Sequence, residues 1–260
     1  MFTFGIEHTS LYDYGTKDGR LGDLPPDLLD VIGPSGDKYR DPFTRACLYL
    51  VRHPAATTGR GDTIVIGTEY GNTAALAQLQ RAAADQGRLL SAQHFPNATS
   101  SSAAAFLAIN VGATGPNTTL NAARLTPAVA LWRALLALAS AQSTTSHLLI
   151  GDIYAPEASL DDRAAQHRDG VAYGKLCATG NLRARFDFSV KGTASGGGFR
   201  IGYDGGQPAR EYTERNGAFA TMDFLSRAQT LSAGETVVFE CFQSTGQRAE
   251  VVVTKGRALR

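Results

Sequence analysis

The sequence has few cysteines and few histidines, which argues against metal centres and disulfide frameworks. The three cysteines, Cys47, Cys177 and Cys241, lie far apart, and no CxxC motif occurs. Five histidines are scattered without the spacing of metal ligands. An odd number of cysteines in 260 residues is more typical of reduced thiols in the cytoplasm than of a secreted disulfide scaffold. We therefore expect no metal, no cofactor and a cytoplasmic location.

Charge and long apolar runs are also scarce. Charged residues make up 19% of the chain and the formal net charge is +1, so nothing favours electrostatic binding of nucleic acid or acidic membranes. No apolar run reaches the ~18 residues of a membrane span, and Arg133 interrupts the closest candidate, residues 125–141. The first seven residues lack a basic segment, so we expect no signal peptide.

The first 155 residues alternate candidate strands with candidate helices, which predicts a mostly parallel sheet covered by helices. The candidate strands are residues 2–6, 63–67, 117–121 and 147–151, and the candidate helices are residues 42–51, 73–86, 100–111 and 127–141. Residues 127–141 are apolar nearly all round, which is typical of a helix buried on most sides.

The remaining sequence is less regular. We expect short strands within residues 171–190, a glycine-rich loop at 191–206, a helix at 217–232 and a closing pair of strands at 236–242 and 249–254. The prediction is one domain, residues 1–260, with an N-terminal half of residues 1–155 and a reduced C-terminal half of residues 156–260.

One stretch carries a family resemblance. His94-Phe95-Pro96-Asn97 precedes a helix of small residues, and Gly115-Pro116-Asn117-Thr118-Thr119-Leu120 precedes the apolar helix. This order and spacing resemble the β-ketoacyl synthase family, including the chain-length factors of type II polyketide synthases. The resemblance covers residues 64–154, with weaker echoes at Asp169-Gly170 and in the closing strands. It implies an α/β fold of the thiolase type, layered α-β-α-β-α, with two related halves of which the second is truncated.

The departures from the family concern its chemistry. The family places a cysteine at the N-terminus of the buried helix, where the helix dipole favours the thiolate. In this sequence Arg124 occupies that position, and an arginine cannot carry an acyl chain as a thioester. Its charge opposes the helix N-terminus, so it must find a carboxylate, solvent or a partner. The family also needs two histidines in its second half, and none follows His167 here. The resemblance therefore implies a chain with no catalytic residue.

The resemblance also implies a partner surface. Thiolase-fold proteins pair through the strand before the nucleophile position, and small residues on the adjacent helix allow close approach. The expected interface residues are Asn117, Thr118, Thr119, Leu120, Asn121, Ala103 and Ala104. A proline at Leu120 is expected to remove a backbone donor from the shared sheet. Phe95, Phe106 and Leu107 are candidates for reaching the partner's acyl tunnel, and filling this chain's own core is an equal alternative for each.

The leading hypothesis is a non-catalytic, chain-length-factor-like subunit that forms a heterodimer with an active ketosynthase. The pair would serve polyketide, polyene or fatty acyl synthesis, and an acyl carrier protein would deliver substrate to the partner. Two alternatives stay open. One is an acyl-transfer enzyme on the same scaffold, with Cys177 or Cys241 as the nucleophile. The other is a homodimeric protein that binds acyl chains.

Overall fold

The computed structural model describes residues 1–15, 25–35, 37, 40–52, 59, 61–86, 92–154, 168–192, 196–203 and 209–256. These residues form one nine-stranded sheet in the order β3-β2-β4-β5-β9-β8-β6-β7, with β1 paired to β5. The strands are β1 (Phe2–Gly15), β2 (Thr63–Gly67), β3 (Asn117–Leu120), β4 (Thr145–Asp152), β5 (Asp169–Val190), β6 (Gly198–Tyr203), β7 (Arg210–Tyr212), β8 (Thr236–Phe242) and β9 (Gln247–Lys255). The helices are α1 (Leu28–Ile32), α2 (Pro42–Arg52), α3 (Thr73–Gln86), α4 (Ser102–Val111), α5 (Thr126–Ala139) and α6 (Ala218–Thr230), with 3-10 segments η2 (Ala92–Asn97) and η3 (Ala123–Leu125).

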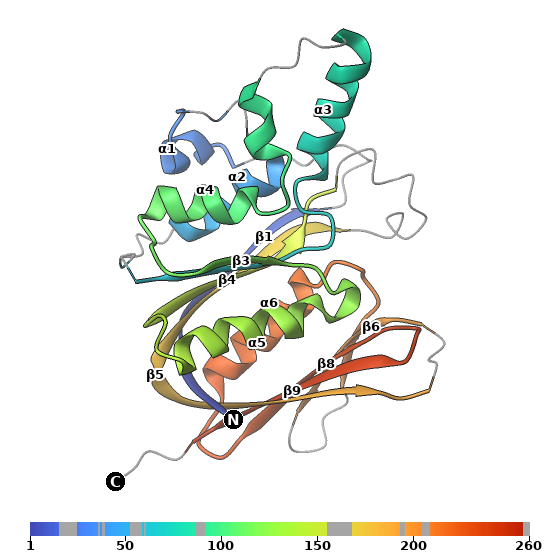
Figure 1. The fold of residues 1–260 in the computed structure, drawn as a ribbon. Helices are drawn as coiled ribbons and strands as arrows, with labels where there is room; N and C mark the ends of the chain where they lie inside the picture. The colour runs from blue at the N-terminus through green and yellow to red at the C-terminus, as the bar shows by residue number, and fades with distance from the viewer. Residues whose placement is uncertain are drawn as a thin grey trace.

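The long strand β5 joins two wings of the sheet. Its first part pairs with β4 and β1, and its second part, from Leu182, pairs with β9. The upper wing contains β3, β2 and β4, which are parallel to one another, and the lower wing contains the antiparallel strands β9, β8, β6 and β7. Figure 1 shows α5 and α6 enclosed between the two wings, and α1, α2 and α4 above the upper wing.

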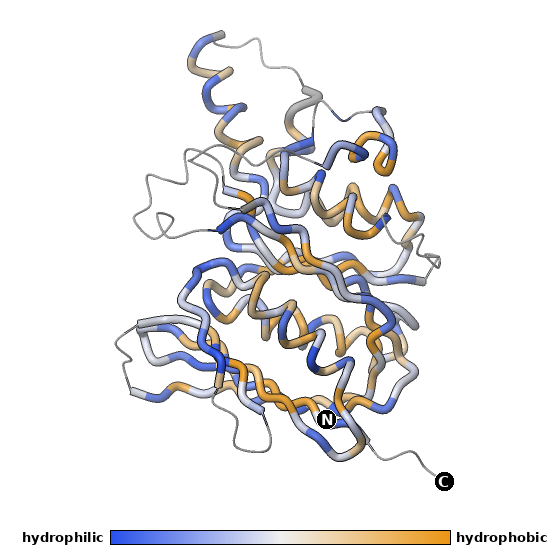
Figure 2. Tube along the Cα trace, turned by 180° about the vertical axis from the view of Figure 1, so that it is seen from behind, coloured by the Kyte–Doolittle hydropathy of each residue, from blue (hydrophilic) through white to orange (hydrophobic). Residues whose placement is uncertain are grey.

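Two apolar cores follow from this layering. The larger core lies around α5 and α6 and includes Leu131, Leu135 and Phe224 together with Val251 and Val253 of the lower wing. The second core lies between the upper wing and the outer helices. In Figure 2 the hydrophobic colour is concentrated in the enclosed helices and the strands beside them. The apolar helix predicted at residues 127–141 is therefore confirmed as a core element.

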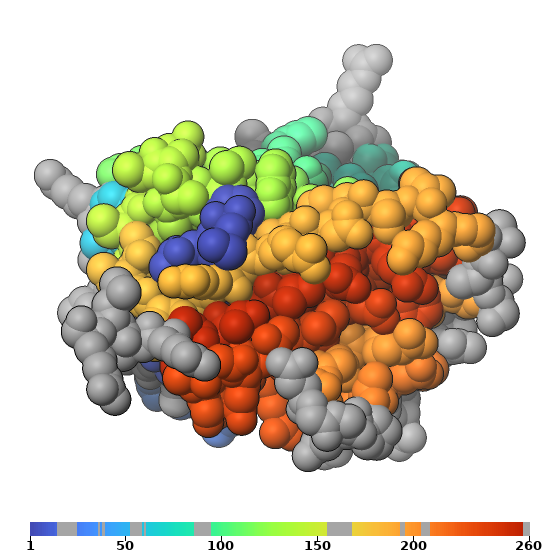
Figure 3. All heavy atoms as spheres, turned by 90° about the horizontal axis from the view of Figure 1, so that it is seen from below, coloured from blue at the N-terminus to red at the C-terminus, as the bar shows by residue number. Residues whose placement is uncertain are grey.

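The outer face of the lower wing carries charged side chains, and Figure 3 shows its strands at the surface. Along β8 the buried residues Phe239 and Cys241 alternate with Glu240, as expected for a strand with one solvated face. Arg200 lies 3.1 Å from Glu240 and 2.8 Å from Glu211 across neighbouring strands. Within the described residues the layering is therefore α-β-α-β. No described helix covers the outer face of the lower wing, the side on which the fifth layer was expected.

Most predicted elements are present, with differences in both halves: β1 extends to Gly15 instead of ending at Ile6. Residues 169–190 form one strand rather than several short ones. The loop predicted at 191–206 contains β6, because Phe199 and Ile201 alternate into the core despite the surrounding glycines. A side chain at Gly198 would place its Cβ 2.8 Å from the carbonyl oxygen of Tyr212, so close strand approach explains that glycine. None of the described helices is long and apolar enough to cross a membrane.

Candidate functional site

The turn from β3 into α5 is strained at Ala123. This residue has φ = +49°, a conformation that costs free energy for any residue except glycine. Two hydrogen bonds hold the turn: the Ala123 N–H donates to Asn121 Oδ1 (3.0 Å), and the Ala122 N–H donates to Thr126 Oγ1 (2.8 Å). The residue with the strained backbone, Ala123, thus directly precedes Arg124. Neither side chain can form a thioester.

Arg124 binds the loop before α6. Its Nη1 donates to the carbonyl oxygen of Glu214 (2.7 Å), and its guanidinium lies 5.6 Å from the ring centre of Phe199. Burial, and secondly the charge of Arg215, lower the pKa of Arg124 from its ordinary value. Within the described residues the arginine thus meets a backbone carbonyl and an aromatic face rather than a carboxylate, and its side chain stays partly exposed.

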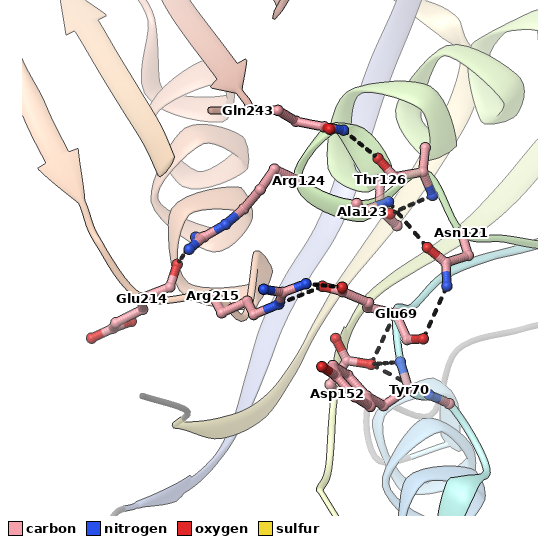
Figure 4. Close-up of polar contacts among 12 residues, drawn as sticks. Glu69, Tyr70, Asn121, Ala123, Arg124, Thr126, Asp152, Glu214, Arg215 and Gln243 are labelled. Carbon is pink, nitrogen blue, oxygen red and sulfur yellow. Dashed lines mark hydrogen bonds and ion pairs between the residues drawn. The ribbon is translucent and has the colours of Figure 1, made fainter. Parts of the chain in front are cut away.

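An ion pair fills the space beside the start of α5. Arg215 Nε donates to Glu69 Oε2 (2.9 Å), and Arg215 Nη2 bonds the other carboxylate oxygen. The two side chains are 10% and 16% exposed. The cavity remaining among Glu69, Ala123 and Arg215 measures about 10 Å³, room for one water at most. Figure 4 shows the pair between the two helix starts.

The carboxylate of Asp152 supports the loop that carries Glu69. Its Oδ1 accepts hydrogen bonds from Thr68 Oγ1 (2.5 Å) and from the backbone N–H groups of Glu69 (3.0 Å) and Tyr70 (2.7 Å). Complete burial raises the pKa of Asp152 to about 6, although these hydrogen bonds oppose the rise. Asn121 Nδ2 adds a bond to the Glu69 carbonyl (3.0 Å), so the loop and the turn before α5 are held together.

The starts of α5 and α6 touch each other. A Cβ at Gly217 would lie 2.5 Å from Pro127 Cγ, so only glycine allows this approach. Asn216 fixes the segment: its Nδ2 donates to the carbonyl oxygens of Asp152 (3.1 Å) and Gly170 (3.0 Å), and its Oδ1 accepts from the Ala218 N–H (3.0 Å). The side chains of Glu69, Asp152, Arg215 and Asn216 converge, although nothing in the sequence analysis connected them.

Strand β3 lies at the edge of the described sheet, as the partner prediction requires. The N–H and C=O of one strand residue point to the same side, and the sides alternate along the strand. The carbonyl oxygens of Pro116 and Leu120 accept bonds from β2 residues. The backbone groups of Asn117 and Thr119 therefore face the open edge. The expectation that Leu120 supplies a donor to a partner is wrong, because its backbone faces β2.

Three other predicted residues are not available to a partner. The side chains of Ala103, Ala104 and Leu107 are at most 2% exposed. They lie on the side of α4 that packs on the sheet, and so they belong to this chain's own core. The prediction of Ala103 and Ala104 as interface residues is therefore wrong, and for Leu107 the alternative that it fills this chain's own core holds. Phe95 is 51% exposed, and Phe106 is half-buried beneath the guanidinium of Arg40 (5.9 Å). These two stay candidates.

The alternative nucleophiles are poorly placed. All three cysteines are free and buried. Burial raises the pKa of Cys241 far above that of a reactive thiol. The Sγ of Cys177 donates to the carbonyl oxygen of Thr179 (2.9 Å).

His147 is a satisfied core residue rather than a ligand. Its Nε2 lies 3.0 Å from Asp62 Oδ2 and its Nδ1 lies 2.9 Å from the Tyr173 hydroxyl. Because an ionised carboxylate only accepts, Nε2 donates to Asp62, and in the neutral imidazole Nδ1 accepts from the Tyr173 hydroxyl. The carbonyl oxygen of Asp62 accepts from the Gly115 N–H (3.1 Å), so this buried chain of bonds also holds the segment before β3.

Comparison with known proteins identifies the fold. No family model and no curated protein matches the sequence. A chain of the ishigamide ketosynthase/chain length factor is similar in structure, with a TM-score of 0.71 and 16% identity over 98% of this chain and 100% of the other. A chain of the ketosynthase ApeO in complex with its chain length factor ApeC from Xenorhabdus doucetiae is also similar, with a TM-score of 0.60 and 13% identity over 98% of this chain and 100% of the other. A β-ketoacyl synthase from Burkholderia phymatum has a TM-score of 0.63 and 9% identity over 99% of this chain and 100% of the other.

The protein therefore has the thiolase-like α/β fold of ketosynthases and chain-length factors, as the sequence resemblance implied. At these identities the likeness is one of fold.

Proposed function

We propose that this protein is a non-catalytic, chain-length-factor-like subunit that pairs with an active ketosynthase. The pair would act in polyketide, polyene or fatty acyl synthesis in the cytoplasm, with an acyl carrier protein delivering substrate to the partner. The observation that carries the proposal is the start of α5, where Ala123 and Arg124 stand beside a space closed by Glu69 and Arg215.

The proposed lack of acyl-transfer chemistry is supported by these side chains. Acyl transfer through a thioester needs a thiolate, and a helix N-terminus stabilises one. Ala123 has no nucleophilic atom, and the guanidinium of Arg124 is a cation that a helix N-terminus disfavours. A cavity of about 10 Å³ also leaves no room for an acyl group at this point.

The partner role is supported by the surface around β3. An edge strand offers unpaired backbone groups to another chain. The two helices that contact β3 carry exposed apolar side chains: Ile109 on α4 is 80% exposed and Trp132 on α5 is 36% exposed. Exposed apolar groups flanking an open strand are typical of an interface. Two of the similar solved structures are described as a ketosynthase with its chain length factor.

The test is co-expression with a ketosynthase encoded beside this chain. We expect a one-to-one complex by size-exclusion chromatography with light scattering, and an elongation activity that requires both chains. A ketosynthase that elongates normally without this chain, and does not co-purify with it, contradicts the proposal.

The homodimeric acyl-binding alternative has one observation in its favour. A surface hollow of about 540 Å³ lies beside the turn before α5, and Leu125, Phe188 and Val190 contribute apolar side chains to it. A two-fold symmetric dimer of the isolated chain that binds a fluorescent fatty acid at one site per subunit would favour this alternative.

A further inference from the structure

Arg133 is the one charged residue of α5, and it has no polar partner among the residues that the structure describes. Its Nη1 is buried and has no hydrogen-bond acceptor, and no described residue makes a hydrogen bond or ion pair with this guanidinium. Arg124, shortly before it, has the carbonyl oxygen of Glu214. A buried polar group without a partner costs free energy, and a charged one costs more. Among the described residues, no polar group therefore holds the partly buried Arg133 guanidinium in its position.

The surroundings of Arg133 are an apolar stripe. Leu125, Val129, Trp132 and Leu136 recur at intervals of three and four residues, so they lie on one side of the helix. All four are at least partly exposed, and Arg133 lies at the margin of this stripe. The helix that carries the stripe also contacts β3, the edge strand of the described sheet. A partner that covers this region would remove water from the guanidinium and must then supply an acceptor.

The continuous segment that carries Arg133 contains no carboxylate. Residues 86–151 contain no aspartate and no glutamate, and they include α4, β3, η3 and α5. In a two-fold symmetric dimer, the same patch of each copy meets the other. If the same segment of a second copy faced Arg133, it would bring only cationic and neutral side chains, and Arg133 would stay unpaired.

We propose that Arg133 selects the partner: it binds a carboxylate on the facing ketosynthase, and the acid-free region around it disfavours self-association. This inference rests on the proposed function and specifies the chemistry of its interface. Charge complementarity of this kind rejects wrong partners because a like charge or an unpaired charge at an interface is unfavourable. The required partner is thus a thiolase-fold subunit with an acidic side chain facing α5.

The experiment compares Arg133→Met with Arg183→Met in the full chain. Methionine keeps the length and apolar contacts of the arginine stem while removing its charge. Arg183 is exposed on the outer face of the lower wing and serves as the matched control. We expect Arg133→Met to weaken binding of the co-encoded ketosynthase roughly ten- to hundredfold in a titration, as for loss of a charged hydrogen bond. Arg183→Met should leave the affinity unchanged.

Thermal melting of the isolated chain separates binding from folding. Arg133→Met should melt at the same temperature as the wild type or higher, because no polar contact is lost within the chain. Arg133→Glu should weaken the complex further, and lysine substitutions of acidic residues on the partner's facing helix should restore it at one position.

The outcomes are distinguishable. If Arg133→Met binds the ketosynthase as tightly as wild type while Thr119→Pro abolishes binding, the role of Arg133 is overturned and the proposed function stands. If the wild-type chain binds no ketosynthase, both fall. A tight dimer of the wild-type chain alone, found by analytical ultracentrifugation, also overturns the claim that the acid-free region disfavours self-association.

Discussion

Glu69 and Arg215 are 146 positions apart in the sequence and form a two-point ion pair beside the start of α5. The pair links the loop after β2 to the segment before α6, and so closes the region between the two enclosed helices. Four predictions concern this region and the neighbouring strand edge.

The first prediction is that the protein is not acylated. Incubation with an acyl carrier protein thioester should give no stoichiometric adduct by intact-protein mass spectrometry. Arg124→Cys and Ala123→Cys should not restore condensation of malonyl units, because the ion pair fills the space and no histidine follows His167. A wild-type adduct at Cys177 or Cys241 would instead favour the acyl-transfer alternative.

The second prediction concerns the energy of the ion pair. Glu69→Gln or Arg215→Met alone should lower the free energy of unfolding by about 2–4 kcal/mol, because each leaves a largely buried charge unpaired. In urea unfolding, the double variant should lose no more than half of the unfolding free energy that either single variant loses. Arg227→Met, which removes an exposed helical pair with Asp223, is the control and should cost less than ~0.5 kcal/mol. Additive losses in the double variant would show that the pair is not coupled.

The third prediction distinguishes two prolines in β3. Thr119→Pro removes an N–H that faces the open edge, so it should reduce ketosynthase binding by at least about a hundredfold while the isolated chain stays folded. Leu120→Pro removes an N–H that faces β2 and should instead destabilise the chain itself by roughly 3 kcal/mol. Chemical unfolding and a binding titration on both variants measure the difference. Equal effects of the two prolines on binding and stability would mean that β3 does not form the interface.

The fourth prediction concerns the pH dependence from Asp152. Its folded-state pKa is raised to about 6, above the ordinary value of 3.8, so the folded protein binds this proton more readily than the unfolded chain. Protonation of Asp152 therefore stabilises the folded protein. This stabilisation is complete below pH ~4 and is lost as the pH rises through 6. Asp152→Asn keeps an oxygen acceptor for the loop and carries no charge. Between pH 4 and 7 the free energy of unfolding of this variant should vary less with pH than that of wild type. At pH 8 the variant should be at least as stable as wild type.

Urea unfolding at pH 5, 6, 7 and 8 measures this effect. Burial also raises the pKa of Asp41 to about 6. The part of the pH dependence that comes from Asp41 therefore remains in Asp152→Asn. Asp152→Ala should be destabilised at every pH, since the loop donors lose their acceptor. An unchanged pH profile in Asp152→Asn would contradict the assignment.

The sequence by itself determined the local elements and the residue types at the expected nucleophile position. The nearly all-round apolar run at residues 127–141 predicted α5, and the short apolar runs at 63–67 and 147–151 predicted β2 and β4, because these signals depend only on neighbours along the chain. The absence of a cysteine near Arg124 and of histidines after residue 167 is likewise visible without coordinates.

Only the tertiary structure decided how distant residues meet. It placed Glu69 on Arg215 and Asp152 under the intervening loop, turned Leu107 into the chain's own core and directed the backbone of Leu120 toward β2. It also left Arg133 without a polar partner among the described residues, beside an open strand edge. These facts depend on strand register and on helix rotation against the sheet. Contacts between segments far apart in the chain fix both, and no local pattern encodes them.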